Sequence, residues 1–414
     1  MSTGAVGRSA METLRIRNFK AIGDSGLLRL TPLTVLIGNN GSGKSSVLEA
    51  LETLQTCVEW GLDAAMQMWR GIEHIRNKSA TAQVGAGSAG VPGSPKPIEI
   101  ELARRIEPQG SSLAWHITAS TAWNERRLPQ LGGQLYTNEL FFERESASVD
   151  YEKLDREGHE GRLVWEELAR DGNTLRDKGR ETRTLSPDES LLGLEMVSLG
   201  IEDWQFVSLS PAAMGEPTPQ TRSSRRIGLS KDGANVAEYL QDIRNTDPAA
   251  FAGIIETLRT VLPYADDLQP ALTSELERTV YLQLAERDFK VPGWLLSTGT
   301  LRILALLALL RHPNPPPLIA IEEIENGLDP RTVHLLVEEI RVAVESGRTQ
   351  VIATTHSPYL LDLLPLSAII FVERIDGEPR FFRPADSKEV LEWAKNFAPG
   401  QLYTMQRLQR EARS

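Results

Sequence analysis

The sequence predicts an α/β protein whose core is divided into two halves by a long antiparallel insertion. An apolar strand pattern at residues 33–37 runs into the glycine-rich segment 38–45 and then into a helical pattern, which is the strand-loop-helix order of a phosphate-binding P-loop. Strand and helix patterns alternate again over residues 318–373, as expected for the other half of a parallel α/β core. The chain between the halves carries short strand patterns with polar connections.

The first half of the core begins with two strands and a helix. Residues 13–18 alternate apolar and polar side chains and predict a half-buried strand, whereas the apolar run at 33–37 predicts a buried one. Residues 49–70 are mainly helical in pattern. The segment 79–97 is rich in Ala, Gly, Ser and Pro and is expected to be a mobile loop.

The insertion is expected to combine a sheet with a helical lobe. Its predicted elements are strands at 98–103, 113–118 and 135–142, a charged and mostly helical stretch at 150–200, a strand at 204–209, and two helices within 233–262. The two helices are expected to separate near Asp247-Pro248. No heptad pattern persists over several turns, so a long coiled coil is not expected.

The second half of the core follows near the carboxyl end. Its predicted elements are a helix at 301–310, a buried strand at 318–321, a helix at 330–344, and strands at 350–353 and 369–373. We therefore expect three parts. Residues 1–212 would hold the P-loop half with the antiparallel insertion and the charged helical segment, 213–290 a helical lobe, and 291–414 the other half of the core.

Charge argues against one class of protein. The 414 residues include 45 basic and 56 acidic side chains, and the formal net charge is −11. This balance argues against a simple basic coat for nucleic acid but leaves a local basic groove open. The densest basic cluster, Arg222, Arg225 and Arg226, is more simply read as part of a solvated loop.

Cysteine content and hydropathy indicate a cytoplasmic protein. Cys57 is the only cysteine, so an intramolecular disulfide or a thiolate zinc site is not expected, and a reducing compartment fits. Residues 1–20 lack a signal-peptide core, and the apolar stretch 301–310 is too short to span a bilayer. We expect no direct membrane insertion.

The glycine-rich segment is the most specific motif of the chain. Gly41 and Gly43 can take backbone angles that other residues avoid, so that successive N–H groups turn inward and hold a phosphate at the start of the next helix. Lys44 would reach the β and γ phosphates of ATP or GTP, and Ser45 would offer its hydroxyl to Mg²⁺. The simpler alternative is a Gly-Ser surface loop ahead of a helix. The candidate nucleotide-binding residues here are Asn39, Asn40, Gly41, Ser42, Gly43, Lys44, Ser45 and Ser46.

Further candidates follow two buried strands. Glu322 and Glu323 come directly after the strand at 318–321, at the edge where a parallel α/β sheet normally holds its ligand. Glu322 could orient Mg²⁺ or its waters, and Glu323 could align or deprotonate the water that attacks the γ phosphate. His356 follows another apolar strand end and is a candidate γ-phosphate sensor. The alternatives are an acidic strand-to-loop junction and a structural histidine.

A second anion site is possible at the start of the helix at 301–310. Ser297 and Gly299 precede this helix within the segment Leu296-Ser297-Thr298-Gly299-Thr300, and helix N-termini bind anions. Taken alone the segment is a weak signal, because a helix cap is the default interpretation.

Together these motifs resemble an ABC-type ATPase head of the branch that contains RecF and the structural-maintenance-of-chromosomes (SMC) proteins. The motif segments occur in the order of that family, at residues 38–45, 296–300, 319–323, 326–330 and 354–358, and the strand start Ile16-Arg17-Asn18-Phe19-Lys20 resembles the branch too. Within the branch the chain is similar to small bacterial AAA-family ATPases of defence systems, which resemble the amino-terminal half of OLD-type nucleases.

The resemblance implies a homodimer whose two heads enclose two ATP molecules with Mg²⁺. One subunit would supply the residues Lys44, Ser45, Glu322, Glu323 and His356. Ser45 and Glu322 would then be metal ligands, and Glu323 and His356 catalytic residues. Ser297 and Gly299 of the other subunit would cap the γ phosphate, and Asp329 would connect the two sites.

The chain departs from the family pattern at several points. Glu322 stands where aspartate is usual, and Ile324 where the related small ATPases often have proline. Gln205 and Gln134 are poor candidates for the family's glutamine-loop residue. We also find no zinc hook, and we expect no nuclease domain after the last predicted strand.

Three functions of different classes remain open. The first is an ATPase switch that acts with a separately encoded effector such as a nuclease, in anti-phage defence or DNA repair, with DNA binding possible. The second is a soluble ATPase subunit of a membrane transporter, against which stand the long antiparallel insertion and the Asn18-Phe19-Lys20 opening. A P-loop kinase acting on a small molecule ranks last.

Overall fold

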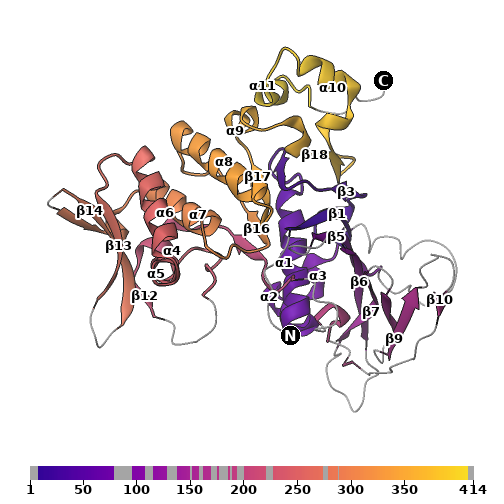
Figure 1. Cartoon of the computed structure of the whole chain (residues 1–414). Helices are drawn as coiled ribbons and strands as arrows, with labels where there is room; N and C mark the ends of the chain where they lie inside the picture. Colours follow the sequence, from indigo (N-terminus) through magenta and orange to yellow (C-terminus); the bar gives the residue numbers. More distant parts are fainter. Residues whose placement is uncertain are drawn as a thin grey trace. The chain divides into compact units, whose positions relative to one another are not determined.

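The structure is a computed structural model of the chain (Figure 1). It describes residues 8–78, 96–107, 115–127, 138–149, 152–157, 162–168, 175–176, 185–186, 189–193, 200–220, 227–273, 278–287 and 289–408. The expected mobile loop at 79–97 lies outside the described residues apart from its last two positions, and the basic cluster Arg222, Arg225 and Arg226 lies outside them as well.

The chain divides into two compact units. Unit 1 comprises Met1–Thr31, Ile37–Trp204 and Ile370–Phe382, and unit 2 comprises Pro32–Leu36, Gln205–Ile369 and Arg383–Ser414. Each unit draws on segments that are distant in the sequence, as expected for a core that is split by an insertion.

In the described part of the chain, unit 1 is built on a nine-stranded antiparallel sheet. Its strands are β1 (Arg8–Phe19), β2 (Ile22–Asp24), β3 (Leu28–Arg29), β5 (Ile98–Glu107), β6 (Trp115–Arg127), β7 (Asn138–Val149), β8 (Glu152–Glu157), β9 (Arg162–Leu168) and β10 (Leu175–Arg176). They lie in the order β10-β9-β8-β7-β6-β5-β1-β2, with β3 beside β1. The insertion therefore extends the sheet that the first strand of the chain begins.

Helices follow the P-loop in unit 1, as predicted. They are α1 (Lys44–Trp60), α2 (Leu62–Met68) and α3 (Ile72–Ile75). Val47, Leu51 and Leu54 recur at helical spacing and are at most 1% exposed, so they form the apolar stripe through which α1 packs against β1. The helix predicted at 49–70 is interrupted at Gly61, whose φ is 88°.

The strands predicted at 98–103, 113–118 and 135–142 are confirmed as β5, β6 and β7. The prediction that 150–200 is mostly helical is wrong, because this stretch contributes β8, β9 and β10. β8 pairs with β7 from Val149 opposite Glu152 to Glu145 opposite Arg156. Pairing with an existing sheet edge overrides the weak helical preference of charged residues, which the sequence pattern could not show.

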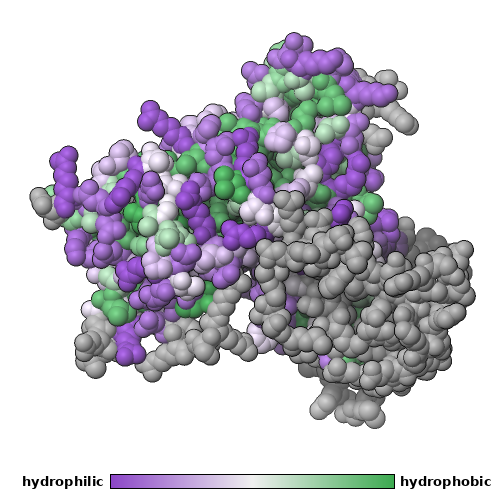
Figure 2. Space-filling view, viewed as in Figure 1, coloured by the Kyte–Doolittle hydropathy of each residue, from purple (hydrophilic) through white to green (hydrophobic). Residues whose placement is uncertain are grey.

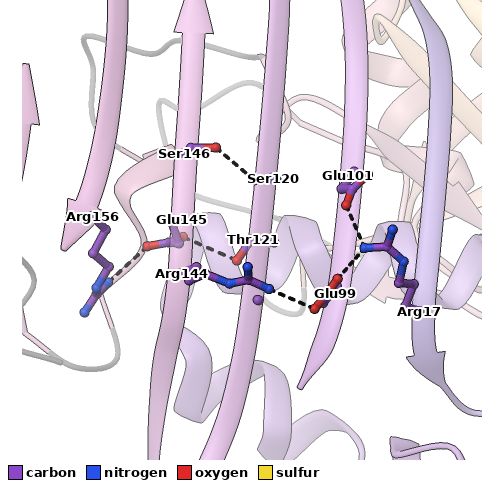
Figure 3. Close-up of a pocket in the computed structure, with 10 residues that line it drawn as sticks. Arg17, Glu99, Glu101, Ser120, Thr121, Arg144, Glu145, Ser146 and Arg156 are labelled. Carbon is purple, nitrogen blue, oxygen red and sulfur yellow. Dashed lines mark hydrogen bonds and ion pairs between the residues drawn. The ribbon is translucent and has the colours of Figure 1, made fainter. Parts of the chain in front are cut away.

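A buried ion pair holds β8 against β7. The side chains of Arg156 and Glu145 are 0% exposed, and Arg156 Nη1 lies 3.0 Å from Glu145 Oε2 (Figure 3). Arg156 also donates to the Glu189 carbonyl at 2.7 Å, and Glu145 accepts from Ser190 Oγ at 2.7 Å. Burial raises the pKa of the Glu145 carboxyl, and its hydrogen bonds and the charge of Arg156 oppose that rise. This network ties the segment around residue 190 to the sheet.

A second set of charges is more exposed. Arg17 Nη1 lies 2.5 Å from Glu99 and 2.9 Å from Glu101, and Arg144 lies 3.0 Å from Glu99 (Figure 3). With the buried pair these residues line a cavity of about 440 Å³. Its three arginines and three glutamates cancel in formal charge, so the cavity offers no net positive field for a phosphate group.

We predict that Arg156→Ala lowers the free energy of unfolding of unit 1 by about 3–5 kcal/mol, because it leaves the Glu145 charge buried without its partner. The control is Arg144→Ala, whose side chain is 69% exposed and whose ion pair contributes only about 0–1 kcal/mol. Urea denaturation of the two variants measures the difference. Equal losses for both would contradict the assigned role of the buried pair.

Unit 2 contains the parallel sheet that the sequence predicts. β11 (Gln205–Val207), β16 (Leu318–Ile321) and β17 (Gln350–Thr355) run parallel, and β4 (Leu33–Ile37) is next to β17. Every residue of β4, β16 and β17 is buried, which explains the apolar sequence of β16 and the apolar residues at the centre of β17. The helices α7 (Thr298–Leu310) and α8 (Pro330–Glu345) pack against each other in this unit.

The lobe between residues 213 and 290 contains the two predicted helices and a sheet that was not predicted. α5 (Val236–Thr246) and α6 (Pro248–Val261) are separated at Asp247, which caps α6 by accepting from the N–H groups of Ala249 and Ala250. The strands are β12 (Thr218–Pro219), β13 (Asp267–Leu272), β14 (Thr279–Glu286) and β15 (Phe289–Pro292), and they pair antiparallel around β14. The lobe is therefore mixed rather than helical. A short helix, α4 (Pro211–Gly215), precedes it.

The predicted strand at 369–373 is confirmed as β18 (Ile369–Ile375), which pairs antiparallel with β19 (Glu378–Phe382). The helices near the carboxyl end are α9 (Pro358–Asp362), α10 (Lys388–Trp393) and α11 (Pro399–Thr404). Figure 2 shows hydrophobic residues among hydrophilic ones in the region of α10 and α11, where Leu391 and Met405 are exposed.

The described helices are limited in length. The longest described helix is α1, with 17 residues, so this part of the chain contains no long coiled coil, as predicted. None of the described helices combines the length and the apolar character that a bilayer crossing requires.

Candidate functional site

The P-loop joins β4 to α1, and its glycines take the expected conformations. Gly41 has φ +72° and Gly43 φ +106°, both in the left-handed region that favours glycine. Gly43 is the N-cap of α1, which has no side-chain cap and no acidic residue in its first turn. In contrast, α7, α8 and α9 are each capped by a side chain. The start of α1 therefore has no side-chain acceptor that would compete with a bound anion.

Close packing requires glycine at two positions of the loop. A Cβ at Gly38 would lie 1.9 Å from the Val372 carbonyl oxygen, and one at Gly43 would lie 2.9 Å from Pro379 Cγ. Val372 and Pro379 belong to β18 and β19. This pair of strands supports the P-loop within unit 1, a contact that the sequence motif did not reveal.

Lys44 and the serines supply the candidate nucleotide-binding side chains of the P-loop. Lys44 is 5% exposed, and its Nζ donates to the carbonyl oxygens of Gly38 at 2.7 Å and Asn39 at 3.0 Å. Ser45 is exposed, and Ser46 is buried. An ammonium held against the loop, an accessible hydroxyl and an uncapped helix start fit a nucleoside triphosphate with Mg²⁺. The other candidates are placed as follows: Asn39 and Asn40 are exposed, and Ser42 is buried.

The acidic candidate residues lie in unit 2, where β16 ends. The Glu322 N–H donates to the Val207 carbonyl of β11 at 3.0 Å. Glu323 then takes φ +44°, and its N–H donates to Thr354 Oγ1 at 2.9 Å. A left-handed conformation costs a non-glycine residue about 1–3 kcal/mol and persists only where the surroundings hold it in place. The backbone of Glu323 is therefore strained and clamped to the end of β17.

The structure explains why residue 324 is isoleucine and not the proline that is often found in related small ATPases. Its side chain is 3% exposed, and its N–H donates to the Thr354 carbonyl at 3.1 Å. Proline has no N–H and would lose this bond. Isoleucine at this position adds a link between the acidic loop and β17.

His356 lies next to the acidic loop. Its backbone N–H donates to Glu325 Oε1 at 2.7 Å, and the residue is half-buried. In the same loop, Asn326 Nδ2 donates to Glu323 Oε2 at 3.1 Å. The structure therefore brings Glu323 and His356 together within unit 2.

Ser297 caps α7, which confirms the simpler interpretation of the segment at 296–300. Ser297 Oγ accepts from the Thr300 N–H at 3.1 Å. A Cβ at Gly299 would lie 2.8 Å from the Gly327 carbonyl oxygen, so glycine is required there by packing against the loop that follows the acidic strand. Contact of either residue with a γ phosphate stays a prediction.

Asp329 caps α8. Its Oδ1 accepts from the N–H groups of Arg331 at 3.0 Å and Thr332 at 3.3 Å. The Thr332 hydroxyl also donates to Asp329 Oδ2, and this hydrogen bond lowers the pKa of the Asp329 carboxyl. A local structural role thus accounts for aspartate at this position, and its expected role in communication between sites stays a prediction.

Three residues near the acidic loop were missed by the sequence analysis. Thr354 binds the backbone of Glu323, Glu325 binds the backbone of His356, and Arg302 of α7 interacts electrostatically with Glu323 and Glu325. Burial lowers the pKa of Arg302, whose Nη2 donates to the Leu209 carbonyl at 2.7 Å. The only feature of the sequence that could have indicated one of them is Glu325, the third carboxylate of the acidic loop after Glu322 and Glu323.

Neither glutamine considered for the glutamine loop gains support. Gln205 Nε2 donates to the carbonyls of Leu229 at 2.6 Å and Phe206 at 3.2 Å, which gives that side chain a structural role in unit 2. Gln134 lies outside the described residues.

The fold and these motifs define an ABC-type ATPase head of the RecF/SMC kind. A model of the family described as "AAA domain, putative AbiEii toxin, Type IV TA system" matches residues 134–362, which is more than half of the chain. The chain belongs to this family. A second model, described as "AAA ATPase domain", matches residues 11–58, the region of the P-loop. The predicted ATPase class is confirmed, and the link to OLD-type proteins stays a prediction.

Two known proteins place the chain more closely. The DNA replication and repair protein RecF of Nostoc punctiforme (strain ATCC 29133 / PCC 73102) is 28% identical over 159 residues, which are 37% of this chain and 36% of RecF. The match thus spans about a third of RecF. The crystal structure of an SMC head bound to the C-terminal winged-helix domain of ScpA covers 90% of this chain and 96% of its own, with 15% identity and a TM-score of 0.51. This second similarity establishes the fold.

We predict that Lys44→Ala weakens ATP binding by about 10- to 100-fold, because a hydrogen bond between charged groups contributes about 1.5–3 kcal/mol. Lys395→Ala is the control, since Lys395 is 66% exposed and pairs only locally with Glu392. Isothermal titration calorimetry measures both affinities. Wild-type affinity in the Lys44 variant would contradict the assignment of the P-loop.

Proposed function

We propose that this ATPase is a switch that closes as a homodimer around two ATP molecules with Mg²⁺ and opens after hydrolysis. The observation that carries the proposal is the clamped junction of β16 and β17, which holds Glu323 beside His356. A carboxylate and a histidine at adjacent strand ends can align water and sense a γ phosphate.

Each site would combine residues from both halves of the core. The residues assigned to one protomer are Lys44, Ser45, Glu322, Glu323 and His356, with the loop residues Asn39, Asn40, Gly41, Ser42, Gly43 and Ser46. Ser45 and Glu322 would hold Mg²⁺, Glu323 would align the attacking water, and His356 would contact the γ phosphate. Ser297 and Gly299 of the second protomer would complete the site.

Packing within unit 2 supports communication between two such sites. Gly299 lies against the carbonyl of Gly327, and the loop that contains Gly327 continues to the cap residue Asp329. A shift of the α7 start on binding a phosphate would therefore act directly on the loop that carries Glu323. We propose that Asp329 transmits this change across the dimer.

We further propose that the switch acts with a separate effector such as a nuclease, in anti-phage defence or DNA repair. The family description names a toxin of a type IV toxin–antitoxin system, and the curated relative is named for DNA replication and repair. The name of the curated relative supports a role in which ATP-driven closure controls an action on DNA.

The central test is Glu323→Gln. We expect steady-state ATP turnover to fall at least about 100-fold, because the group that aligns water is lost, while ATP affinity stays unchanged and the dimer accumulates with ATP. Phosphate release and light scattering coupled to size-exclusion chromatography measure these properties. Glu338→Gln, an exposed carboxylate change on α8, is the control. Undiminished turnover, or a Glu323→Gln protein that stays monomeric at saturating ATP, would refute the proposed switch.

The link to nucleic acid has its own test. We expect duplex DNA to stimulate ATP hydrolysis, and the stimulation to weaken steeply between low and moderate salt, because phosphate contacts release counterions. Turnover assays across a salt series measure this, and tagged protein isolated from its native host reveals any effector by mass spectrometry. Turnover that is indifferent to DNA at low salt would remove the DNA part of the proposal and leave the ATPase assignment standing.

A further inference from the structure

The β16–β17 ladder ends just before the candidate catalytic residues. The last paired residues are Ile321 and Ala353. Beyond them, the loop and the strand end are joined by three hydrogen bonds, two of which go to Thr354 from the N–H groups of Glu323 and Ile324. The third joins the Glu325 carboxylate to the His356 N–H at 2.7 Å. Of these three hydrogen bonds, only the third holds the backbone of His356 itself.

Burial of the Glu325 carboxylate between the acidic loop and the end of β17 is energetically unfavourable. Its Oε2 is buried and has no hydrogen-bond partner among the described residues, and a buried carboxylate oxygen without a partner is unfavourable. Arg302 offsets part of this cost through its electrostatic interaction with Glu325 and Glu323. This unfavourable carboxylate binds the backbone of His356, the proposed γ-phosphate sensor, which indicates a role beyond local stability.

We infer that Glu325 is a positioning residue for ATP hydrolysis. Its Oε1 accepts the His356 N–H and so fixes where the histidine leaves β17, while its own backbone belongs to the loop that carries Glu323. The same side chain therefore sets the distance between the two candidate catalytic groups. Glu325 does not touch the nucleotide in this scheme. The inference rests on the proposed function, because it acts through Glu323 and His356.

The test compares two substitutions at Glu325. Glu325→Leu removes the acceptor, and we expect kcat to fall about 10- to 100-fold through misplacement of His356, with ATP affinity within about threefold of wild type. Glu325→Gln keeps an oxygen at the same reach and should retain kcat within about threefold of wild type, since a hydrogen bond of similar geometry can form. Stopped-flow single turnover and equilibrium binding separate kcat from affinity.

A double-mutant cycle shows whether the effect passes through the histidine. If it does, Glu325→Leu combined with His356→Ala should be no slower than His356→Ala alone. Independent, multiplicative losses would overturn the inference, as would Glu325→Gln falling to the level of Glu325→Leu or Glu325→Leu retaining wild-type kcat.

Two further comparisons keep the result decisive. Should Glu325→Leu unfold, Glu325→Asp shortens the reach by one methylene and should lower kcat while Glu325→Gln does not; equal kcat for the two would count against the inference. The Glu323→Gln variant reports on the proposed function independently. If that variant is inactive and the Glu325 variants are normal, only the positioning role fails, whereas an active Glu323→Gln protein removes the function on which it rests.

Discussion

The parallel pairing of β16 with β17 is the constraint on which the rest of the candidate site depends. The two strands are entirely buried, and their register sets Ile321 opposite Ala353, so the residues that follow each strand emerge side by side. This pairing lets Thr354 hold Glu323 in a left-handed conformation. Without it, the strained backbone would relax and the carboxylate would lose its fixed direction.

The helix N-termini differ in whether a side chain accepts hydrogen bonds from their first-turn N–H groups. α7, α8 and α9 begin with Ser297, Asp329 and Ser357, whose side chains accept from the first-turn N–H groups. The start of α1 is different because its cap is Gly43 and no side chain accepts there. At the start of α1, therefore, no side-chain acceptor competes with a bound phosphate.

The insertion adds strands to the sheet of unit 1, and some of the side chains that join these strands are charged rather than apolar. The buried pair Glu145–Arg156 links β7 to β8, and its contacts tie the segment near Ser190 to these strands. Buried ion pairs contribute little net stability compared with apolar packing, but their loss is costly. The described charged strands of this stretch, β8, β9 and β10, thus belong to a sheet.

The sequence by itself determined the P-loop, the buried strands, the α5–α6 break and the order of the ATPase motifs. These features depend on local chemistry: glycine conformations, apolar runs and proline. Only the tertiary structure decided that β8, β9 and β10 form within the stretch 150–200, that β13, β14 and β15 accompany the two helices of the lobe, and that Glu325 holds the backbone of His356. Each of these depends on a partner elsewhere in the chain, 31 residues away for Glu325, and hydrogen-bond partners at such separations leave no periodic trace in a single sequence.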